Sequence, residues 1–383
     1  MTAAAAILFL VSVWLAVWSY VLYPPWIRRL ARRRTPGPLP EARPPGPAPS
    51  VEVLVSAADE ERVIGARVRD LRAQTYPGPY AIAVGCDGCA DATAHAARQA
   101  LDGAGAPGRV VEYPQRRGKA AVLDDLIASS AADVVVFTDA NTRFDPEAVR
   151  LLAETFADPG VGAACGRLSL EAADGRPSPE TVFWDWETAT KEAEGRLGVC
   201  LGANGAIYAA RRRAVVPLPP GTILDDLLIP ARVAAGGAAS VFAAGAVARE
   251  TLPSRLRDEM SRRFRIGIGA GRVLRRERWL WSFGRRPLLA LVFFSRKAAR
   301  WLAPVAALLA AVSALGSRAL APYAAGALAA AATLALSALG SGAPGRRGRL
   351  YYFAVINLAL SAGVLAGVLG YRRPAWKPVS PRT

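Results

Sequence analysis

The 383-residue sequence predicts an α/β domain with a mostly parallel sheet, and transmembrane helices at both ends of the chain. Three observations support this prediction. β-rich and helical segments alternate between residues 51 and 250, long uncharged apolar segments lie near both termini, and basic residues gather beside those apolar segments. Strand–helix–strand succession is typical of parallel strands joined by crossovers. A composition of 52% hydrophobic and 21% charged residues excludes a disordered chain and a coiled coil.

The net charge of +17 is unevenly distributed along the chain. Residues 28–34 contain five arginines, and residues 253–300 contain 14 Lys/Arg against three Asp/Glu. Residues 35–252, by contrast, carry a net charge of −7. Basic residues beside apolar segments follow the positive-inside rule of membrane proteins. We therefore expect a lipid bilayer, and no nucleic acid, among the partners.

Residues 1–27 are predicted to form an N-terminal transmembrane anchor. Residues 3–23 carry no charge and are long enough to cross the hydrocarbon core of a bilayer. Because the arginines follow this segment, a retained anchor with its N-terminus outside is favoured over a signal peptide. Residues 28–50 are predicted to be a basic linker, which seven prolines make stiff.

The C-terminal region is predicted to return to the membrane. Residues 253–300 should form basic interfacial helices, since the apolar segment within them is too short to span. Residues 301–371 should form three transmembrane helices, and residues 372–383 a tail. Such a multi-pass protein of the inner (plasma) membrane would place the central domain in the cytoplasm. The basic residues of the tail conflict with its outside position, so the topology of the C-terminus stays open.

Residues 51–252 are predicted to be the α/β domain. Strands are expected at 51–57, 80–86 and 133–140, with helices at 59–73, 91–102 and 118–130 between and beside them. Ligands bind beyond the carboxyl ends of parallel strands, and three acidic segments follow these strands: Ala58-Asp59-Glu60, Asp87-Gly88 and Asp139-Ala140-Asn141. Each aspartate alone could cap a helix or shape a turn. Together at one sheet edge, they need a cation or hydrogen-bond donors.

Other motifs are less informative about function. A single histidine, His95, argues against His-ligated metal sites and Ser-His-Asp catalysis. Cys86 and Cys89 form a CxxC pair with no second pair at zinc spacing, which favours a structural role. The glycine-rich segment 267–271 follows a basic helical segment rather than a strand, so it is a poor dinucleotide-binding loop.

Seven sequence blocks in order resemble the membrane-anchored family 2 glycosyltransferases. The blocks are SAADEE (56–61), GCDGCAD (85–91), RRGKAAVL (116–123), FTDANTRFDP (137–146), GANGAIYAARR (202–212), ILDDLLIP (223–230) and RRFRI (262–266). That family has a GT-A (Rossmann-like) fold and includes the cellulose, hyaluronan and poly-N-acetylglucosamine synthases. The resemblance implies a nucleotide-sugar donor and a Mg²⁺ or Mn²⁺ cofactor.

The resemblance also implies roles for individual residues. Asp139 and Asn141 stand at the metal-binding DxD motif, and Asp226, with Asp225 beside it, stands at the catalytic base. Arg265 stands at the arginine of the QxxRW motif, in which Ile266 replaces the tryptophan. By the same resemblance, the residues expected to bind the nucleotide are Ala58, Asp59, Glu60, Asp87, Lys119 and Arg265. Asn204 and Gly205 are expected to lie on the acceptor side.

The expected activity is therefore inverting transfer of a hexosyl or N-acetylhexosaminyl group, from a UDP-linked donor, to a glycan or polyprenyl-linked acceptor. Cell-envelope or extracellular polysaccharide synthesis is the expected setting. Two alternatives stay open. One is a catalytically silent sugar-nucleotide-binding subunit of a polysaccharide secretion complex, and the other is a processive synthase.

Overall fold

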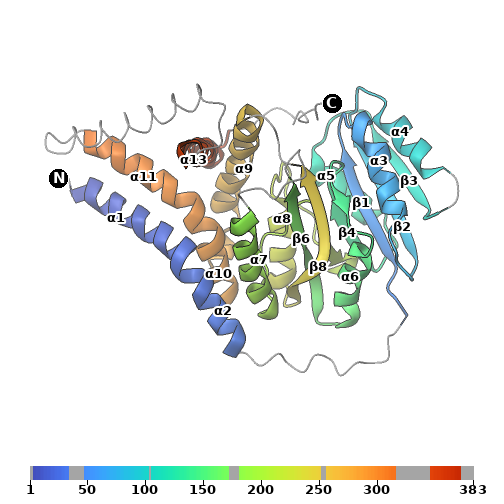
Figure 1. The fold of residues 1–383 in the computed structure, drawn as a ribbon, viewed down its shortest axis with the longest axis horizontal. Coiled ribbons are helices and arrows are strands. Elements are labelled where there is room, and N and C mark those ends of the chain that lie inside the picture. Colours follow the sequence, from blue (N-terminus) through green and yellow to red (C-terminus); the bar gives the residue numbers. More distant parts are fainter. Residues whose placement is uncertain are drawn as a thin grey trace. The chain divides into compact units, whose positions relative to one another are not determined.

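The computed structural model describes residues 3–33, 47–102, 105–171, 181–251, 256–315 and 346–371. The chain divides into two compact units (Figure 1). One comprises residues 27–252 with 373–383, and the other residues 1–26 with 253–372.

An eight-stranded sheet forms the centre of the first unit, in the order β3-β2-β1-β4-β7-β6-β8-β5. Its strands are β1 Val51–Ala57, β2 Tyr80–Asp87, β3 Gly108–Tyr113, β4 Val134–Thr138, β5 Arg143–Phe144, β6 Val161–Glu171, β7 Tyr208–Arg211 and β8 Ala239–Thr251. Its helices are α3 Glu61–Arg72, α4 Thr93–Leu101, α5 Lys119–Ala128, α6 Ala148–Glu154, α7 Thr181–Arg196 and α8 Asp225–Ala235.

The half of the sheet that contains β1 to β4 has parallel strands joined by helical crossovers, as the sequence predicts. Val53 and Val55 of β1 pack with Ile64 and Val68 of α3 in a fully buried core on one face. On the other face, Val122 of α5 lies over β2. Strand β3 was not predicted, because it lies at the sheet edge and is only half-buried, so its apolar pattern is short.

The other half of the sheet adds two strands, β5 and β7, that run opposite to the other six, so most of the strands are parallel, as predicted. Strand β7 runs antiparallel to both β4 and β6, and β5 runs antiparallel to β8, while β6 and β8 are parallel. The sheet is therefore mixed. The alternation of apolar and polar residues identifies a strand but carries no information about its direction, so the sequence did not predict which strands are reversed.

The second unit is helical. It contains α1 Ala3–Val17, a π-helical turn Trp18–Leu22 and the start of α2 Tyr23–Arg33, followed by α9 Leu256–Arg276, a short 3-10 helix Arg278–Trp281, α10 Pro287–Phe293, a second π-helical turn Phe294–Ala298, α11 Ala299–Leu315 and α13 Arg346–Val368. Helix α1 packs against α11, where the Ser12 hydroxyl donates to the Ala303 carbonyl at 3.0 Å. The end of the predicted interfacial region 253–300 continues directly into α11, through α10 and the second π-helical turn.

Within the described residues, one helix is long and apolar enough to cross a membrane, Ala6–Arg33. It continues through the arginines, so the first part of the predicted 28–50 linker is helical. The apolar part of α13, Val355–Val368, is shorter. Residues 316–345, in the middle of the region 301–371 that is predicted to form three transmembrane helices, lie outside the described residues. Transmembrane helices at both ends are thus not confirmed, and the multi-pass arrangement stays a prediction.

The glycine-rich segment 267–271 is a helix-packing surface. A Cβ atom added at Gly267 or Gly271 of α9 would lie 2.3 or 2.2 Å from the backbone of α13. The same holds for Gly363 and Gly367 of α13, at 2.2 and 2.3 Å from the backbone of α9. Each helix thus presents a GxxxG pair to the other, which permits an unusually close backbone approach.

Candidate active site

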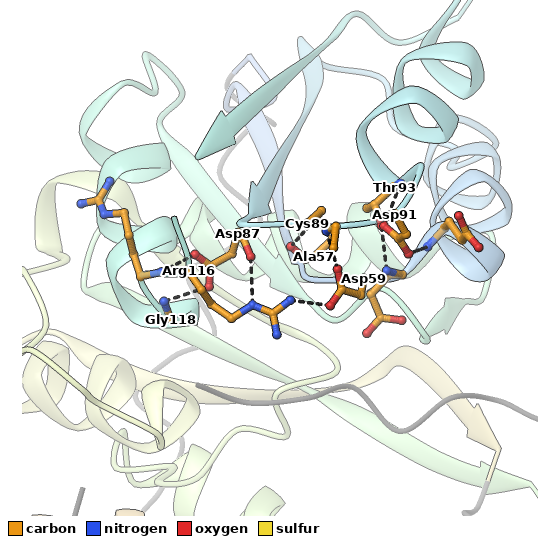
Figure 2. Close-up of polar contacts among 12 residues, drawn as sticks. Ala57, Asp59, Asp87, Cys89, Asp91, Thr93, Arg116 and Gly118 are labelled. Carbon is orange, nitrogen blue, oxygen red and sulfur yellow. Dashed lines mark hydrogen bonds and ion pairs between the residues drawn. The ribbon is translucent and has the colours of Figure 1, made fainter. Parts of the chain in front are cut away.

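Arg116 forms hydrogen bonds to residues at the carboxyl ends of both β1 and β2 (Figure 2). Its guanidinium donates to Oδ2 of Asp59 at 2.6 Å and to the backbone carbonyl of Asp87 at 3.3 Å. Asp59, at φ +57°, also accepts from the Ala90 backbone N–H at 2.8 Å. Burial raises the pKa of Asp59, but these hydrogen bonds outweigh it and leave the pKa below its usual value. Asp59 is therefore an ionised link between two strand ends.

Asp87 shapes the loop that precedes α5. Its carboxylate is buried and accepts backbone hydrogen bonds from Arg117 at 2.6 Å and Gly118 at 2.8 Å (Figure 2). Gly88, at φ +57°, lies so near this loop that a Cβ atom would come within 2.6 Å of the Arg116 nitrogen. Asp87 thereby holds in place the segment that begins α5 and carries Lys119.

Asp59, Cys89 and Asp91 bring ligand-type atoms within 4.8 Å of one another. The carboxylate oxygens already accept protein hydrogen bonds. Asp91 accepts from the backbone N–H of Thr93 at 3.0 Å and of Glu61 at 3.2 Å, and Asp59 accepts as described above (Figure 2). These hydrogen bonds organise the turns after β1 and β2, and the three side chains are also placed so that they could hold a metal ion.

The two cysteines of the CxxC pair are free thiols that interact with each other. The Cys86 side chain is buried, whereas Cys89 is half-buried and donates to the Ala57 carbonyl at 3.6 Å. The hydrogen bond from Cys86 lowers the pKa of Cys89 to about 7, and the same interaction, with burial, raises the pKa of Cys86.

Glu60 connects these turns electrostatically with the end of β4. Burial, followed by the charge of Asp139, raises the pKa of Glu60 to about 7. Its backbone N–H donates to the Thr93 hydroxyl at 2.7 Å, which fixes the position of the residue.

Lys119 is the centre of the site. Its ammonium lies 2.9 Å from Oδ1 of Asp139, after β4, and 3.3 Å from Oδ2 of Asp225, at the start of α8. Burial lowers the pKa of Lys119, but the carboxylates of Asp139 and Asp225 outweigh it and raise the pKa above its usual value. The lysine is therefore a permanent cation between two carboxylates.

Asp225 is buried and accepts a hydrogen bond from the Tyr208 hydroxyl at 2.7 Å. Asp226 is half-buried in the first turn of α8, and its backbone carbonyl accepts from Ala203 at 3.1 Å. The two adjacent aspartates thus have different surroundings.

The turn at Asn204 and Gly205 lies against the same centre. A Cβ atom on Gly205 would lie 3.3 Å from Oδ2 of Asp139 and 3.7 Å from the Lys119 nitrogen. The Asn204 side-chain carbonyl accepts from the buried Lys191 ammonium at 2.9 Å. The predicted acceptor-side turn therefore borders Asp139.

The structure brings most of the predicted residues to one edge of the sheet. Asn141 is exposed in the turn after β4, and Ala58 is buried beside Asp59. Arg265 is half-buried on α9, in the helical unit, so its contact with the donor stays a prediction. Sequence reasoning missed Arg116, Tyr208 and Lys191. Arg116 stands in the block 116–123 and Tyr208 in the block 202–212, whereas Lys191 lies in none of the seven blocks.

This chain is similar to known proteins in both sequence and structure. Two curated N-acetylglucosaminyltransferases are similar in sequence. That of Azorhizobium caulinodans is 26% identical over 225 residues, covering 54% of this chain and 56% of the relative. That of Rhizobium leguminosarum bv. viciae is 27% identical over 176 residues, covering 45% and 41%. The matches thus span about half the length of these relatives.

A solved mannosyltransferase of Pyrobaculum calidifontis, in complex with GDP-Man and Mn²⁺, has a similar structure. The TM-score is 0.63 at 21% sequence identity, over 94% of this chain and 98% of that one. This similarity shows a common, GT-A-like fold. A profile of the "Glycosyltransferase like family 2" matches residues 47–269, more than half of the sequence. The seven sequence blocks, the fold and this match together show that the chain belongs to glycosyltransferase family 2.

Proposed function

We propose that the protein is a membrane-associated, inverting glycosyltransferase. It transfers a sugar from a UDP-linked donor to a hydroxyl group of a glycan or a lipid-linked acceptor. The observation that carries this proposal is the convergence of Lys119 with Asp139 and Asp225 at the carboxyl ends of the strands. Sugar transfer from a nucleoside diphosphate needs charge neutralisation of the leaving group and a base for the acceptor hydroxyl. Lys119 and Asp139 serve the first need, and Asp226, the neighbour of Asp225 in α8, serves the second.

The donor nucleotide binds along the ends of β1 and β2 in this proposal. Ala58, Asp59 and Glu60 line the base and ribose, and Asp87 shapes the loop that faces them. Lys119 is the cation available to the diphosphate, and Arg265 from α9 adds a second.

Asp139 and Asn141 would hold the divalent cation. The side chain of Asp139 is 37% exposed, and Gly205 puts no side chain beside its Oδ2 atom. Asn141 is exposed two residues further along the same turn. A carboxylate and an amide carbonyl are suitable ligands for Mg²⁺ or Mn²⁺, whose remaining positions diphosphate oxygens can fill. When bound, such an ion stabilises the departing diphosphate. The Mn²⁺ in the similar mannosyltransferase supports a divalent cation as the cofactor.

Asp226 is the proposed base. The carboxylate of Asp225 is buried and engaged by the Tyr208 hydroxyl and by Lys119, which leaves it less accessible to an acceptor hydroxyl than Asp226. Asp226, less buried in the same helical turn, accepts the proton of the acceptor hydroxyl while that oxygen attacks the anomeric carbon. A single direct displacement of this kind inverts the configuration at that carbon. Asn204 and Gly205 border the place where the acceptor enters.

N-acetylglucosamine is the sugar to test first, because the curated relatives are named N-acetylglucosaminyltransferases. The test is to incubate the purified full-length protein with Mn²⁺ and a panel of UDP-sugars and GDP-Man, and to measure release of the nucleoside diphosphate. We expect release from UDP-N-acetylglucosamine and its loss in Asp226→Asn and Asp139→Ala. UDP binding without turnover of any donor would favour a silent binding subunit, and an early ladder of long polymer would favour a processive synthase.

The proposed location is the inner membrane, with several spans and a cytoplasmic catalytic domain. The apolar helix Ala6–Arg33 and its terminal arginines support this orientation. A cysteine introduced at Thr2 should react with an impermeant maleimide in intact cells, whereas one at Asp102 should not. Labelling at both positions would place the domain outside, away from nucleotide-sugars, and would contradict the proposed function.

A further inference from the structure

Lys119 contacts Asp139, the carboxylate that is proposed to bind the divalent cation. Its ammonium hydrogen-bonds Oδ1 of Asp139 at 2.9 Å, and Asp139 is the one carboxylate of the proposed cation site. A divalent ion that binds this carboxylate must share it with a positive charge at hydrogen-bond distance, or displace that charge.

The ammonium is held on its other side by a buried pair. Oδ2 of Asp225 lies 3.3 Å from the Lys119 nitrogen and also accepts the Tyr208 hydroxyl at 2.7 Å. Asp225 is 4% exposed and Tyr208 is fully buried. The Tyr208 ring stacks on buried Phe137, with centroids 4.5 Å apart and an interplanar angle of 13°. Asp225 cannot move away from Lys119 without leaving a buried hydroxyl unsatisfied, which is costly.

The carboxylates of Asp139 and Asp225 therefore both bind the Lys119 ammonium, and they keep it beside Asp139, the predicted metal ligand. A polyanion that reaches the site changes this balance, because its oxygens compete with Asp139 for the ammonium. Gly205 leaves room for such movement, since it presents no side chain to either Asp139 or Lys119.

We propose that Lys119 is a tethered counter-cation of Asp139, which opposes divalent-cation binding until a nucleoside diphosphate draws its ammonium away. The nucleotide and the metal ion then bind cooperatively, and the free protein has little affinity for the metal. This proposal rests on the proposed function for the identity of the polyanion, whereas the competition between Lys119 and the metal ion does not depend on it.

The test is a Mn²⁺ titration of the full-length protein in detergent, followed by electron paramagnetic resonance, with and without UDP. For the wild type we expect Mn²⁺ to bind at least about tenfold more tightly when UDP is present. Lys119→Met removes the competing charge, so without UDP it should bind Mn²⁺ at least about tenfold more tightly than the wild type. Lys119→Arg keeps the charge and should retain weak binding without UDP. Circular dichroism establishes that each variant is folded.

Asp139→Asn is the control for the site and should weaken Mn²⁺ binding in both the wild-type and the Lys119→Met backgrounds. If Lys119→Met binds Mn²⁺ no more tightly than the wild type in the absence of UDP, or if Asp139→Asn has no effect, the proposal is wrong. A failure of UDP to bind any variant would instead contradict the proposed function, and the Mn²⁺-only titrations would still decide the role of Lys119.

Discussion

The Tyr208 hydroxyl donates a 2.7 Å hydrogen bond to Oδ2 of Asp225, and both side chains are buried. Burial, together with the negative charge of Asp225, raises the pKa of Tyr208 well above its usual value, so the hydroxyl stays protonated and remains a donor. This bond distinguishes two adjacent aspartates. Asp225 is buried and forms an ion pair with Lys119, whereas Asp226 is less buried.

The two aspartates should respond differently to substitution. Asp226→Asn keeps the shape of the side chain and removes its basicity, so turnover should fall by roughly 100-fold or more, the usual contribution of a positioned base. UDP affinity should stay close to that of the wild type. Steady-state kinetics and calorimetric UDP titration measure these quantities. Asp225→Asn should instead lower the free energy of unfolding by about 1–3 kcal/mol, because Lys119 and Tyr208 lose a charged partner. A larger loss of turnover in Asp225→Asn would show that the base is Asp225.

Asn141 should set the strength of the metal site. Asn141→Asp replaces an amide carbonyl by a carboxylate, the stronger ligand for a hard cation, so Mn²⁺ should bind more tightly in the presence of UDP. Asp139→Ala removes the principal ligand, and both Mn²⁺ binding and activity should be lost. Donor hydrolysis that is unchanged in EDTA would contradict this assignment.

The glycine contacts between α9 and α13 should be intolerant of even one methyl group. In Gly267→Ala, the new Cβ would lie 2.3 Å from the carbonyl oxygen of Leu360, which forces the helices apart. We expect a loss of about 1–3 kcal/mol in the free energy of unfolding, as for other overpacked sites. Thermal unfolding in detergent measures the change.

Gly284→Ala is the matched control for this prediction, because its Cβ would meet no atom within 4 Å. Equal stability losses in Gly267→Ala and Gly284→Ala would show that the close helix approach is unimportant for stability.

Cys89 should be the most reactive thiol of the first unit. Its pKa of about 7 lies below the usual value because Cys86 hydrogen-bonds to it, so the thiolate forms as the pH rises through 7. Alkylation by iodoacetamide, followed by mass spectrometry, should accelerate between about pH 6 and 8 at Cys89. Buried Cys86, whose pKa is raised, should remain unmodified in the folded protein. Preferential labelling of Cys86, or a rate at Cys89 that does not change across this range, would contradict the assignment.

Local pattern predicted the parallel part of the sheet and supplied the residues of the proposed site. The apolar runs of β1, β2 and β4 locate three strands, and the crossover helices follow from the segments between them. The order of short polar blocks after these strands pointed to the family, which the profile match confirms. These features depend on residues near one another in the sequence, where period and turn chemistry carry the information.

Tertiary structure alone decided the direction of β7, the close contact of α9 with α13, and the position of Lys119 between Asp139 and Asp225. Tyr208 shows why. In the sequence it is one aromatic residue of a short strand, and only the pairing of β7 with β4 and the start of α8 place its hydroxyl against Asp225. The sequence by itself specifies which side chains carry charge, whereas which charges meet depends on packing between segments far apart in the chain. Burial then strengthens these charge–charge interactions, because water no longer screens them.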